Sequence, residues 1–347
     1  MPFACASSAD LTPDGERDSS VNRATAFAYL AAAGVIAGVA CAATPQPAHA
    51  DSTLLSVDGP LSGSDTAIIV GGTIEPTPST AFAQTAENLY LHPLGFDGGA
   101  SYSAVCDISG TEPCGAPLQV LTTPELIQQG PSALAGASDI VHAVENELAA
   151  NPGAFSAEDP LTVFGYSQGA EAESIAMTQL TQDGIPADEL HFVFIGDPSA
   201  PDGIWANVEP DLDALIGPNN ANAVINLLDP IFGLKDAIGV LTPDDLYPTT
   251  VYTLAGDAVA DFQADYNSAG LLGILGGIAV HASYLGLTAS EIADASTSVS
   301  GDIAYVDLSG PFNELGAITG AIDSGLLSSG LFQSLFDSFE YALHAIF

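Results

Sequence analysis

The amino-acid sequence predicts an α/β fold in which a mostly parallel sheet carries helices on both faces. Apolar, β-branched segments typical of buried strands occur at residues 66–70, 161–164, 191–196 and 249–254. Segments with helical spacing of apolar residues lie between them, at 138–150 and 170–180. Strands that alternate with helices favour parallel pairing. The chain of 347 residues, with 47% hydrophobic residues, can bury a sizeable core.

Residues 161–170 (LTVFGYSQGA) carry the clearest functional signal. The apolar run meets Gly165-Tyr-Ser167-Gln-Gly169 and a helix follows, which is the context of a G-x-S-x-G nucleophile elbow in α/β-hydrolases. A Cβ atom at either glycine would collide with a neighbouring strand or helix. The sharp turn is expected to raise the Ser167 hydroxyl above the sheet and to leave the backbone N–H of Gln168 facing an oxyanion. The alternative is a glycine-rich turn with a passive serine.

The first predicted strand ends in Gly71-Gly72-Thr73. Glycines at the carboxyl end of a strand let the backbone approach a ligand, and in a hydrolase fold the second oxyanion N–H comes from this place. We therefore expect Gly72 and Thr73 to complete the oxyanion hole, with the Thr73 hydroxyl as a further donor. A simple tight turn is the alternative.

A serine nucleophile needs a base and an acid that orients it, and in this fold the chain order is Ser, acid, His. His92 and His142 precede the serine, His191 begins a strand and His344 lies in an apolar C-terminal segment. His281 follows a strand that ends in acidic residues, so it is the predicted base.

The acid remains open between Asp257 and Asp261, which both follow the strand at 249–254. Asp197, at the end of the preceding strand, is a weaker third candidate. Sequence alone does not decide which carboxylate reaches Nδ1 of His281.

The charge balance excludes several partners. The chain has 43 acidic and 3 basic residues, a formal net charge of -40. It cannot form a phosphate-binding surface, so nucleic acid is not an expected partner, and anionic lipid headgroups are repelled. No metal or organic cofactor is expected, since a Ser-His-Asp triad requires neither.

Residues 1–50 resemble an export signal. Arg17 and Arg23 precede an apolar, alanine-rich run at 24–43, and Ala48-His49-Ala50 is an A-x-A cleavage site. We expect cleavage after Ala50 and a mature chain at 51–347 that forms one domain without an integral membrane span. A retained anchor is the alternative, although the run is short for a span.

Three further features lie in the mature chain. Cys106 and Cys114 flank a turn-rich segment, and two close cysteines in an exported chain are expected to form a disulfide. Residues 202–247 look irregular and are predicted to be an insertion over the sheet's carboxyl edge, suited to a lid or an acyl-chain groove. An ordinary packed excursion of the chain is the alternative. Residues 310–347 have the apolar spacing of a helical tail.

Taken in order, several motifs resemble the PE-PPE domain, a serine-hydrolase domain of mycobacteria and related actinobacteria that is similar to cutinases. The motifs are Ile68-Ile-Val-Gly-Gly-Thr73 with Pro76-Thr-Pro-Ser79, Leu121-Thr-Thr-Pro-Glu125, Phe164-Gly-Tyr-Ser-Gln168, Ile195-Gly-Asp-Pro198 with Pro201-Asp-Gly203, residues 257–262 and His281-x-x-Tyr284. The resemblance covers about residues 60–290. It implies that Ser167 is the nucleophile and His281 the base, while both aspartates of the acid motif are retained, as Gly256-Asp257-Ala258 and Asp261-Phe262-Gln263.

The resemblance implies esterase or lipase activity on acyl esters, and the export signal at 1–50 predicts a location outside the cell or in its envelope. The expected function is therefore a secreted serine esterase with a lipid or acyl-ester substrate. Two alternatives stay open: an acyltransferase that uses the same triad with an envelope glycolipid as acceptor, and a non-catalytic envelope or binding protein on a hydrolase scaffold.

Overall fold

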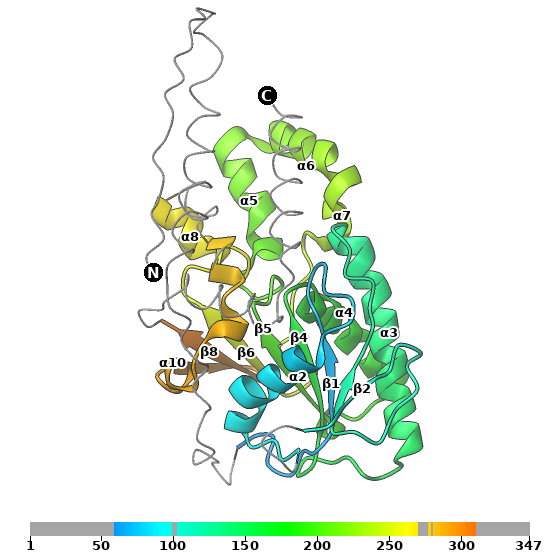
Figure 1. Cartoon of the computed structure of the whole chain (residues 1–347). Helices are drawn as coiled ribbons and strands as arrows, with labels where there is room; N and C mark the ends of the chain where they lie inside the picture. Colours follow the sequence, from blue (N-terminus) through cyan, green and yellow to red (C-terminus); the bar gives the residue numbers. More distant parts are fainter. Residues whose placement is uncertain (1–58, 99–102, 270–276, 279, 310–347) are drawn as a thin grey trace, which may run out of the picture. The chain divides into compact units, whose positions relative to one another are not determined.

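The computed structural model describes residues 59–98, 103–269, 277–278 and 280–309. The chain divides into two compact units, residues 1–49 and 50–347, and every described residue belongs to the second. The predicted signal segment and the predicted C-terminal tail at 310–347 lie outside the described residues, as does His344. Figure 1 shows the described part as a central sheet with helices on both of its faces.

The sheet has eight strands in the order β2-β3-β1-β4-β5-β6-β8-β7. All neighbouring strands pair in parallel except β7 and β8, which are antiparallel. The strands are β1 (Ala67–Val70), β2 (Val105–Asp107), β3 (Leu118–Val120), β4 (Leu161–Tyr166), β5 (Leu190–Ile195), β6 (Thr249–Leu254), β7 (Ser296–Ser300) and β8 (Ile303–Leu308). The predicted α/β-hydrolase fold, with a mostly parallel sheet, is confirmed.

Helices are found at α2 (Thr80–Ala86), α3 (Gln129–Ala150), α4 (Gln168–Asp183), α5 (Ile204–Ile216), α6 (Pro218–Phe232), α7 (Leu234–Ala237), α8 (Phe262–Ala269) and α10 (Ala289–Ala293). A π-helical turn spans Glu87–Leu91, and 3-10 turns span His92–Leu94, Ala187–Glu189 and Tyr284–Gly286.

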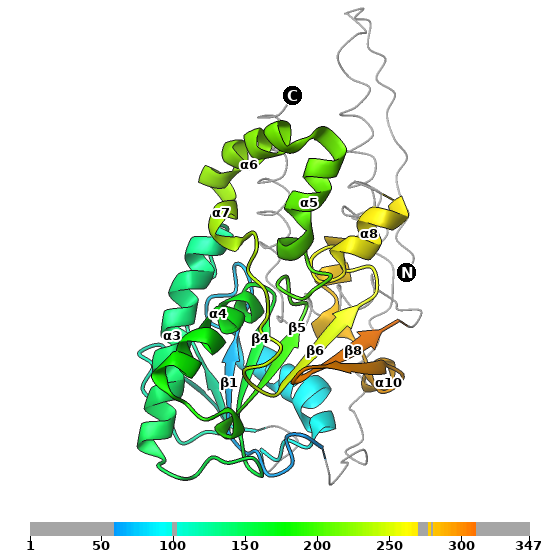
Figure 2. The same ribbon diagram turned by 180° about the vertical axis from the view of Figure 1, so that it is seen from behind.

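The core has two layers because side chains alternate along each strand. Ile68, Val163 and Phe192 point to the face that α3 and α4 cover. Ile69 and Phe164 point to the opposite face, where α2 and the segment around Tyr284 pack. Figures 1 and 2 show these helix layers on the two sides of the sheet. The central strands β1, β4 and β5 are buried on both faces, as continuous apolar sequences favour.

Helix α3 begins at Gln129 and not at 138, where the sequence predicted it. Its first turns contain Gly130 and Gly136, which weaken the helical signal. Both are needed for packing: a Cβ at Gly136 would lie 3.3 Å from Ala172 Cβ of α4, and one at Gly130 would lie 2.6 Å from Ala237 N of α7.

Most of residues 204–237 is helical, which corrects the sequence prediction of an irregular segment at 202–247, whereas residues 238–247 contain no helix or strand. The helical part forms α5, α6 and α7, which we call the cap. Pro210 and Pro230 lie inside helices, and Gly217 and Gly233 separate them, so the helical pattern is masked in the sequence. Figures 1 and 2 show the cap beyond the carboxyl ends of β4 and β5. Within the described ranges, no helix has both the length and the apolar character that crossing a membrane requires.

Cys106 and Cys114 lie together, with Cα atoms 6.6 Å apart and a disulfide between them. That separation is within the range that such a bond spans. The pair closes the loop between the edge strand β2 and the approach to β3. Cys114 N also donates to the side chain of Gln119 on β3, at 3.2 Å.

Candidate active site

Ser167 stands on the turn between β4 and α4. Its backbone has φ 55° and ψ −118°, a strained conformation for a residue with a Cβ. Its N–H donates to the carbonyl of Ile195, at the end of β5, at 3.0 Å. The turn thus tethers the serine to the neighbouring strand and directs its side chain off the end of the sheet.

The two glycines of the elbow are required by close backbone contacts. A Cβ at Gly165 would lie 2.8 Å from Ala170 N, and one at Gly169 would lie 2.3 Å from the carbonyl oxygen of Gly71. Neither neighbour can move aside, because both are backbone atoms. The collisions predicted from the sequence are thus found at both positions.

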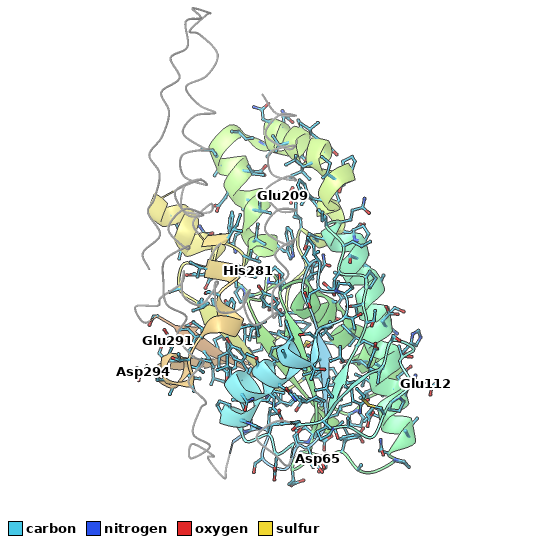
Figure 3. The ribbon with its side chains drawn as sticks, in the orientation of Figure 1. Asp65, Glu112, Glu209, His281, Glu291 and Asp294 are labelled. Atoms are coloured by element: carbon cyan, nitrogen blue, oxygen red, sulfur yellow. A yellow bond between two sulfur atoms is a disulfide. The ribbon has the colours of Figure 1, made fainter. Side chains whose placement is uncertain are left out.

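Ser167, His281 and Asp257 form a continuous hydrogen-bonded chain. His281 Nε2 lies 2.8 Å from Ser167 Oγ, and His281 Nδ1 lies 2.9 Å from one oxygen of Asp257 and 3.0 Å from the other. The His281 side chain is 13% exposed and that of Asp257 is fully buried. The site therefore opens to solvent on the serine side and is closed behind the acid. His281 is labelled in Figure 3.

Asp257 is held as an acceptor by three further donors. The backbone N–H groups of Val259 and Ala260 donate to its Oδ1 at 2.8 and 3.2 Å, and the Tyr284 hydroxyl donates to its Oδ2 at 2.7 Å. Tyr284 Oη in turn accepts the N–H of Leu254, at the end of β6, at 2.9 Å. These bonds fix the orientation of the carboxyl group toward the imidazole.

Asp261 and Asp197 have other partners. Asp261 Oδ2 accepts the N–H of Gly256 at 3.1 Å. Asp197 accepts from Ser199 N at 2.8 Å and from the Thr242 hydroxyl at 2.6 Å. Of the three aspartates considered from the sequence, the described contacts bring only Asp257 to His281.

Two residues that the sequence argument did not consider fix the imidazole. The Tyr166 ring stacks on that of His281, with centroids 5.4 Å apart, and its hydroxyl donates to the carbonyl of His281 at 2.9 Å. Gly196 leaves room on another side, since a Cβ there would lie 2.8 Å from His281 Cε1. Tyr166 directly precedes the nucleophile in the sequence, and this position could have identified it as a residue that contacts the catalytic histidine.

Two of the three predicted oxyanion residues, Gln168 and Gly72, lie beside the serine. Gln168 is the first residue of α4, so its N–H has no acceptor within the helix. Gly72, which follows β1, is also close to the serine, because a Cβ at Gly72 would lie 3.0 Å from Ser167 Cβ. The Thr73 hydroxyl faces the Gln129 side chain, with distances of 3.3 Å to Oε1 and 3.2 Å to Nε2. An anion between Gly72 and Gln168 would also meet the positive end of α4.

A group of buried carboxyl groups lies beneath this elbow, and the sequence analysis missed it. Its members are Glu125, Glu171, Glu173 and Asp197. Burial raises the pKa of Glu125 to about 8, that of Glu171 to about 8 and that of Asp197 to about 6, and it raises the pKa of Glu173 well above its ordinary value. Neighbouring carboxyl groups raise the pKa of the three glutamates further. Glu171 and Glu173 alternate with alanines in the sequence, and this apolar setting could have indicated that they are buried.

The buried carboxyl groups do not form a metal centre. Within the described ranges, no three or more His, Cys, Asp or Glu side chains converge as metal ligands would. Burial instead favours the protonated form of these side chains. Glu171 Oε2 accepts the indole N–H of Trp205 on α5, at 2.9 Å, and so links the nucleophile helix to the cap.

Residues 116–306 match the model of the PE-PPE domain. The chain belongs to this family. PE-PPE relatives in Mycobacterium tuberculosis include the uncharacterized PPE family protein PPE28, 30% identical over 240 residues, and Esterase PE16, 29% identical over 247 residues. The matches cover 68% and 67% of this chain but only 32% and 39% of the relatives, so the chain spans well under half of their length.

Solved structures with a similar course of the chain include esterases. A cutinase-like protein from Cryptococcus sp. is 15% identical, with a TM-score of 0.29, and the match covers 61% of this chain and 93% of that one. The cell wall degrading esterase LipA from Xanthomonas oryzae is 11% identical, with a TM-score of 0.33, and the match covers 79% and 81% of the two chains. The PE-PPE resemblance seen in the sequence motifs is confirmed by the family match.

Proposed function

We propose that this protein is a serine esterase that hydrolyses acyl esters through Ser167, His281 and Asp257. The observation that carries the proposal is the hydrogen-bonded chain from Ser167 Oγ through His281 to Asp257, on a strained elbow. Membership of the PE-PPE family and a relative named Esterase PE16 support the same class of reaction.

In the first half-reaction, Ser167 Oγ attacks the ester carbonyl carbon while His281 Nε2 takes the hydroxyl proton. The Asp257 carboxylate stabilises the imidazolium that forms. The backbone N–H of Gln168, with Gly72 and Thr73, donates to the tetrahedral oxyanion. Losing one such donor typically lowers the rate by about 100- to 1000-fold.

The tetrahedral intermediate collapses when the bond to the alcohol oxygen breaks and His281 donates its proton to the departing alkoxide. The acyl group is then bound to Ser167. A water molecule gives a proton to His281 and attacks the acyl carbon, and a second collapse releases the carboxylic acid and restores the Ser167 hydroxyl. Each proton taken by His281 is returned within the same half-reaction.

We further propose that the enzyme acts outside the cytoplasm on lipid esters. The support is the export-type sequence at 1–50, the expected cleavage after Ala50 and the paired cysteines Cys106 and Cys114, since disulfides persist in oxidising compartments. Mass spectrometry of protein recovered from the culture medium or cell envelope tests this. A mature N-terminus at Asp51 supports export, and an intact N-terminus with reduced cysteines in the cytosol contradicts it.

A fluorophosphonate probe tests the catalytic proposal directly. The protein should be labelled at Ser167, and Ser167→Ala should abolish both labelling and release of p-nitrophenol from a short p-nitrophenyl ester. Ser138→Ala, an exposed serine on α3, is the matched control and should behave as the unsubstituted chain. Failure of the folded protein to react would favour the non-catalytic alternative.

Acyl transfer is the second candidate from the sequence, and it uses the same acyl-enzyme. A sugar hydroxyl would replace water in the second half-reaction. Hydrolysis of a p-nitrophenyl ester with and without trehalose separates the two, by measuring free acid and acyl-sugar products. Hydrolysis predicts that free acid dominates, and an excess of acyl-trehalose would replace the esterase proposal with transfer.

A further inference from the structure

Three residues with a strained backbone lie in or beside the two turns that carry the predicted oxyanion donors. Among the described residues, the non-glycine residues with positive φ are Ile74, Thr111, Glu125 and Ser167. Ser167 is the proposed nucleophile. Ile74 and Glu125 contact each other, since the Ile74 N–H donates to the Glu125 carbonyl at 2.7 Å. Such strain persists only where the surrounding contacts hold the backbone in place.

The contact between Ile74 and Glu125 holds the turn after β1. Ile74 directly follows Thr73 in the sequence, and the Glu75 N–H closes the turn by donating to the carbonyl of Gly72 at 2.8 Å. Glu125 belongs to the segment between β3 and α3. The turn that carries Gly72 and Thr73 is therefore bonded to a segment that lies outside both β1 and the elbow.

The side chain of Gln168 bonds the same segment to the nucleophile elbow. Its Nε2 donates to the carbonyl of Leu126 at 3.0 Å. Its Oε1 accepts the Ser132 hydroxyl at 3.1 Å, and Ser132 Oγ accepts the Leu126 N–H at 2.9 Å. The three residues form a closed ring of hydrogen bonds in which the Gln168 side chain is fully buried. Leu126 follows Glu125, so one short segment is bonded to both turns.

The two turns need such a link because their donors come from different strands. Gln168 follows β4 and Gly72 follows β1. The parallel pairing of these strands ends at Val70 opposite Gly165, before either turn begins. A tetrahedral oxyanion has to meet both N–H groups at once, each within about 2.7 to 3.1 Å. Residues 125–126 are bonded to both turns and so link the positions of the donors.

We propose that the Gln168 side chain is a positioning residue of the esterase reaction, which keeps the oxyanion donors of the two turns in register through Leu126. The proposal rests on the esterase function proposed above. The side chain is fully buried and acts through the backbone, so its loss should change the rate of the chemical step and not the binding of the ester. A displaced donor keeps part of its effect, and the expected loss is therefore about 10- to 100-fold.

Gln168→Met tests the proposal, because methionine has a similar length but lacks the amide. With a short p-nitrophenyl ester, kcat should fall about 10- to 100-fold while KM stays within threefold. The rate constant for labelling by a fluorophosphonate should fall by a similar factor, since attack on phosphorus also places negative charge on an oxygen that the donors bind. Gln179→Met, on the exposed side of α4, is the matched control and should keep the original values.

Ser132→Ala is the second variant, and it decides the question if Gln168→Met does not fold. It removes one member of the ring and leaves the bond between Gln168 and Leu126, so kcat should fall about three- to tenfold. The double substitution should lower kcat by less than the product of the two single effects, because both act within one ring. An additive double effect would contradict a shared ring.

The outcomes separate the positioning role from the esterase function. Folded Gln168→Met protein with kcat and labelling rate within twofold of the unsubstituted values would overturn the positioning role and leave the esterase standing, as would a fall in stability alone. A rise in KM at unchanged kcat would overturn it as well, because the side chain would then act in substrate binding. Unsubstituted protein that neither hydrolyses esters nor reacts with the probe would overturn both proposals together.

Discussion

Replacing Glu171 by glutamine should make the protein more stable at neutral pH. The side chain is fully buried on α4, and desolvation raises its pKa from the ordinary 4.5 to about 8; the Trp205 bond lowers it and Asp197 raises it further. Between these two values the folded state holds a proton that the unfolded chain releases. Stability therefore falls as the pH rises through this window. At about 1.36 kcal/mol per pKa unit, the loss approaches about 5 kcal/mol above pH 8 and is about 3 kcal/mol at pH 7.

Glutamine removes this loss because it cannot ionise, and its oxygen can still accept the Trp205 indole N–H. At pH 5 the carboxyl group of folded Glu171 is protonated, so the substitution should change the free energy of unfolding little. From pH 5 to pH 7 the advantage of Glu171→Gln over the unsubstituted protein should grow by about 2 to 3 kcal/mol.

Urea denaturation at pH 5 and pH 7, followed by Trp205 fluorescence in high salt, measures this difference. High salt screens the general repulsion among carboxylates, which also changes with pH. Glu112→Gln is the control, because Glu112 is exposed and labelled on the surface in Figure 3. A difference between Glu171→Gln and the unsubstituted protein that stays constant from pH 5 to pH 7 would refute the argument.

Three further predictions concern the site and its surroundings. Asp257→Asn should lower kcat/KM for a p-nitrophenyl ester about 10⁴-fold, while Asp261→Asn should stay within tenfold; the reverse order would show that the other aspartate orients the histidine. Tyr284→Phe removes a bond to a charged group worth about 1.5 to 3 kcal/mol, so kcat should fall about 10- to 100-fold with KM nearly unchanged, and an unaltered kcat would contradict this positioning role. Replacing Cys106 and Cys114 by serine should lower the free energy of unfolding by about 2 to 3 kcal/mol, measured by urea titration, and leave the esterase activity unchanged. If the substituted and unsubstituted proteins are equally stable, the disulfide does not contribute to stability.

The nucleophile elbow could be predicted from sequence because its determinants are local. Gly165, Ser167 and Gly169 lie within one turn, and the strand before and the helix after it are both strongly patterned. The position of His281 followed from chain order in the fold. These features require no knowledge of distant contacts.

The choice between Asp257 and Asp261 could not be predicted because a turn decides it. Asp257 accepts the N–H groups of the residues that follow it, Val259 and Ala260, and this local arrangement directs its remaining acceptor capacity to His281. Asp261, one turn later, bonds back to Gly256. Both aspartates follow β6 and precede His281, so their spacing in the sequence does not show which of them contacts the histidine.

The buried glutamates were missed for a different reason. Glutamate is usually assigned to the surface, so Glu171 and Glu173 make α4 look half exposed, although both side chains are fully buried. Strand β7 was also missed, since every residue of Ser296–Ser300 is exposed and the segment resembles a loop in composition. In both cases packing overrides what the residue types favour.

The position of β8 has a consequence for the order of assembly. All three proposed triad residues precede it in the chain, yet β8 pairs along the whole of β6, from Thr249 opposite Ile303 to Leu254 opposite Leu308. Until residue 308 has been synthesised, β6, the strand that leads into the Asp257 turn, has an unpaired edge, which is a common starting point for aggregation. Catalytic competence is thus expected only after β8 has docked. A partly synthesised chain can hold every catalytic side chain and still be unable to turn over an ester.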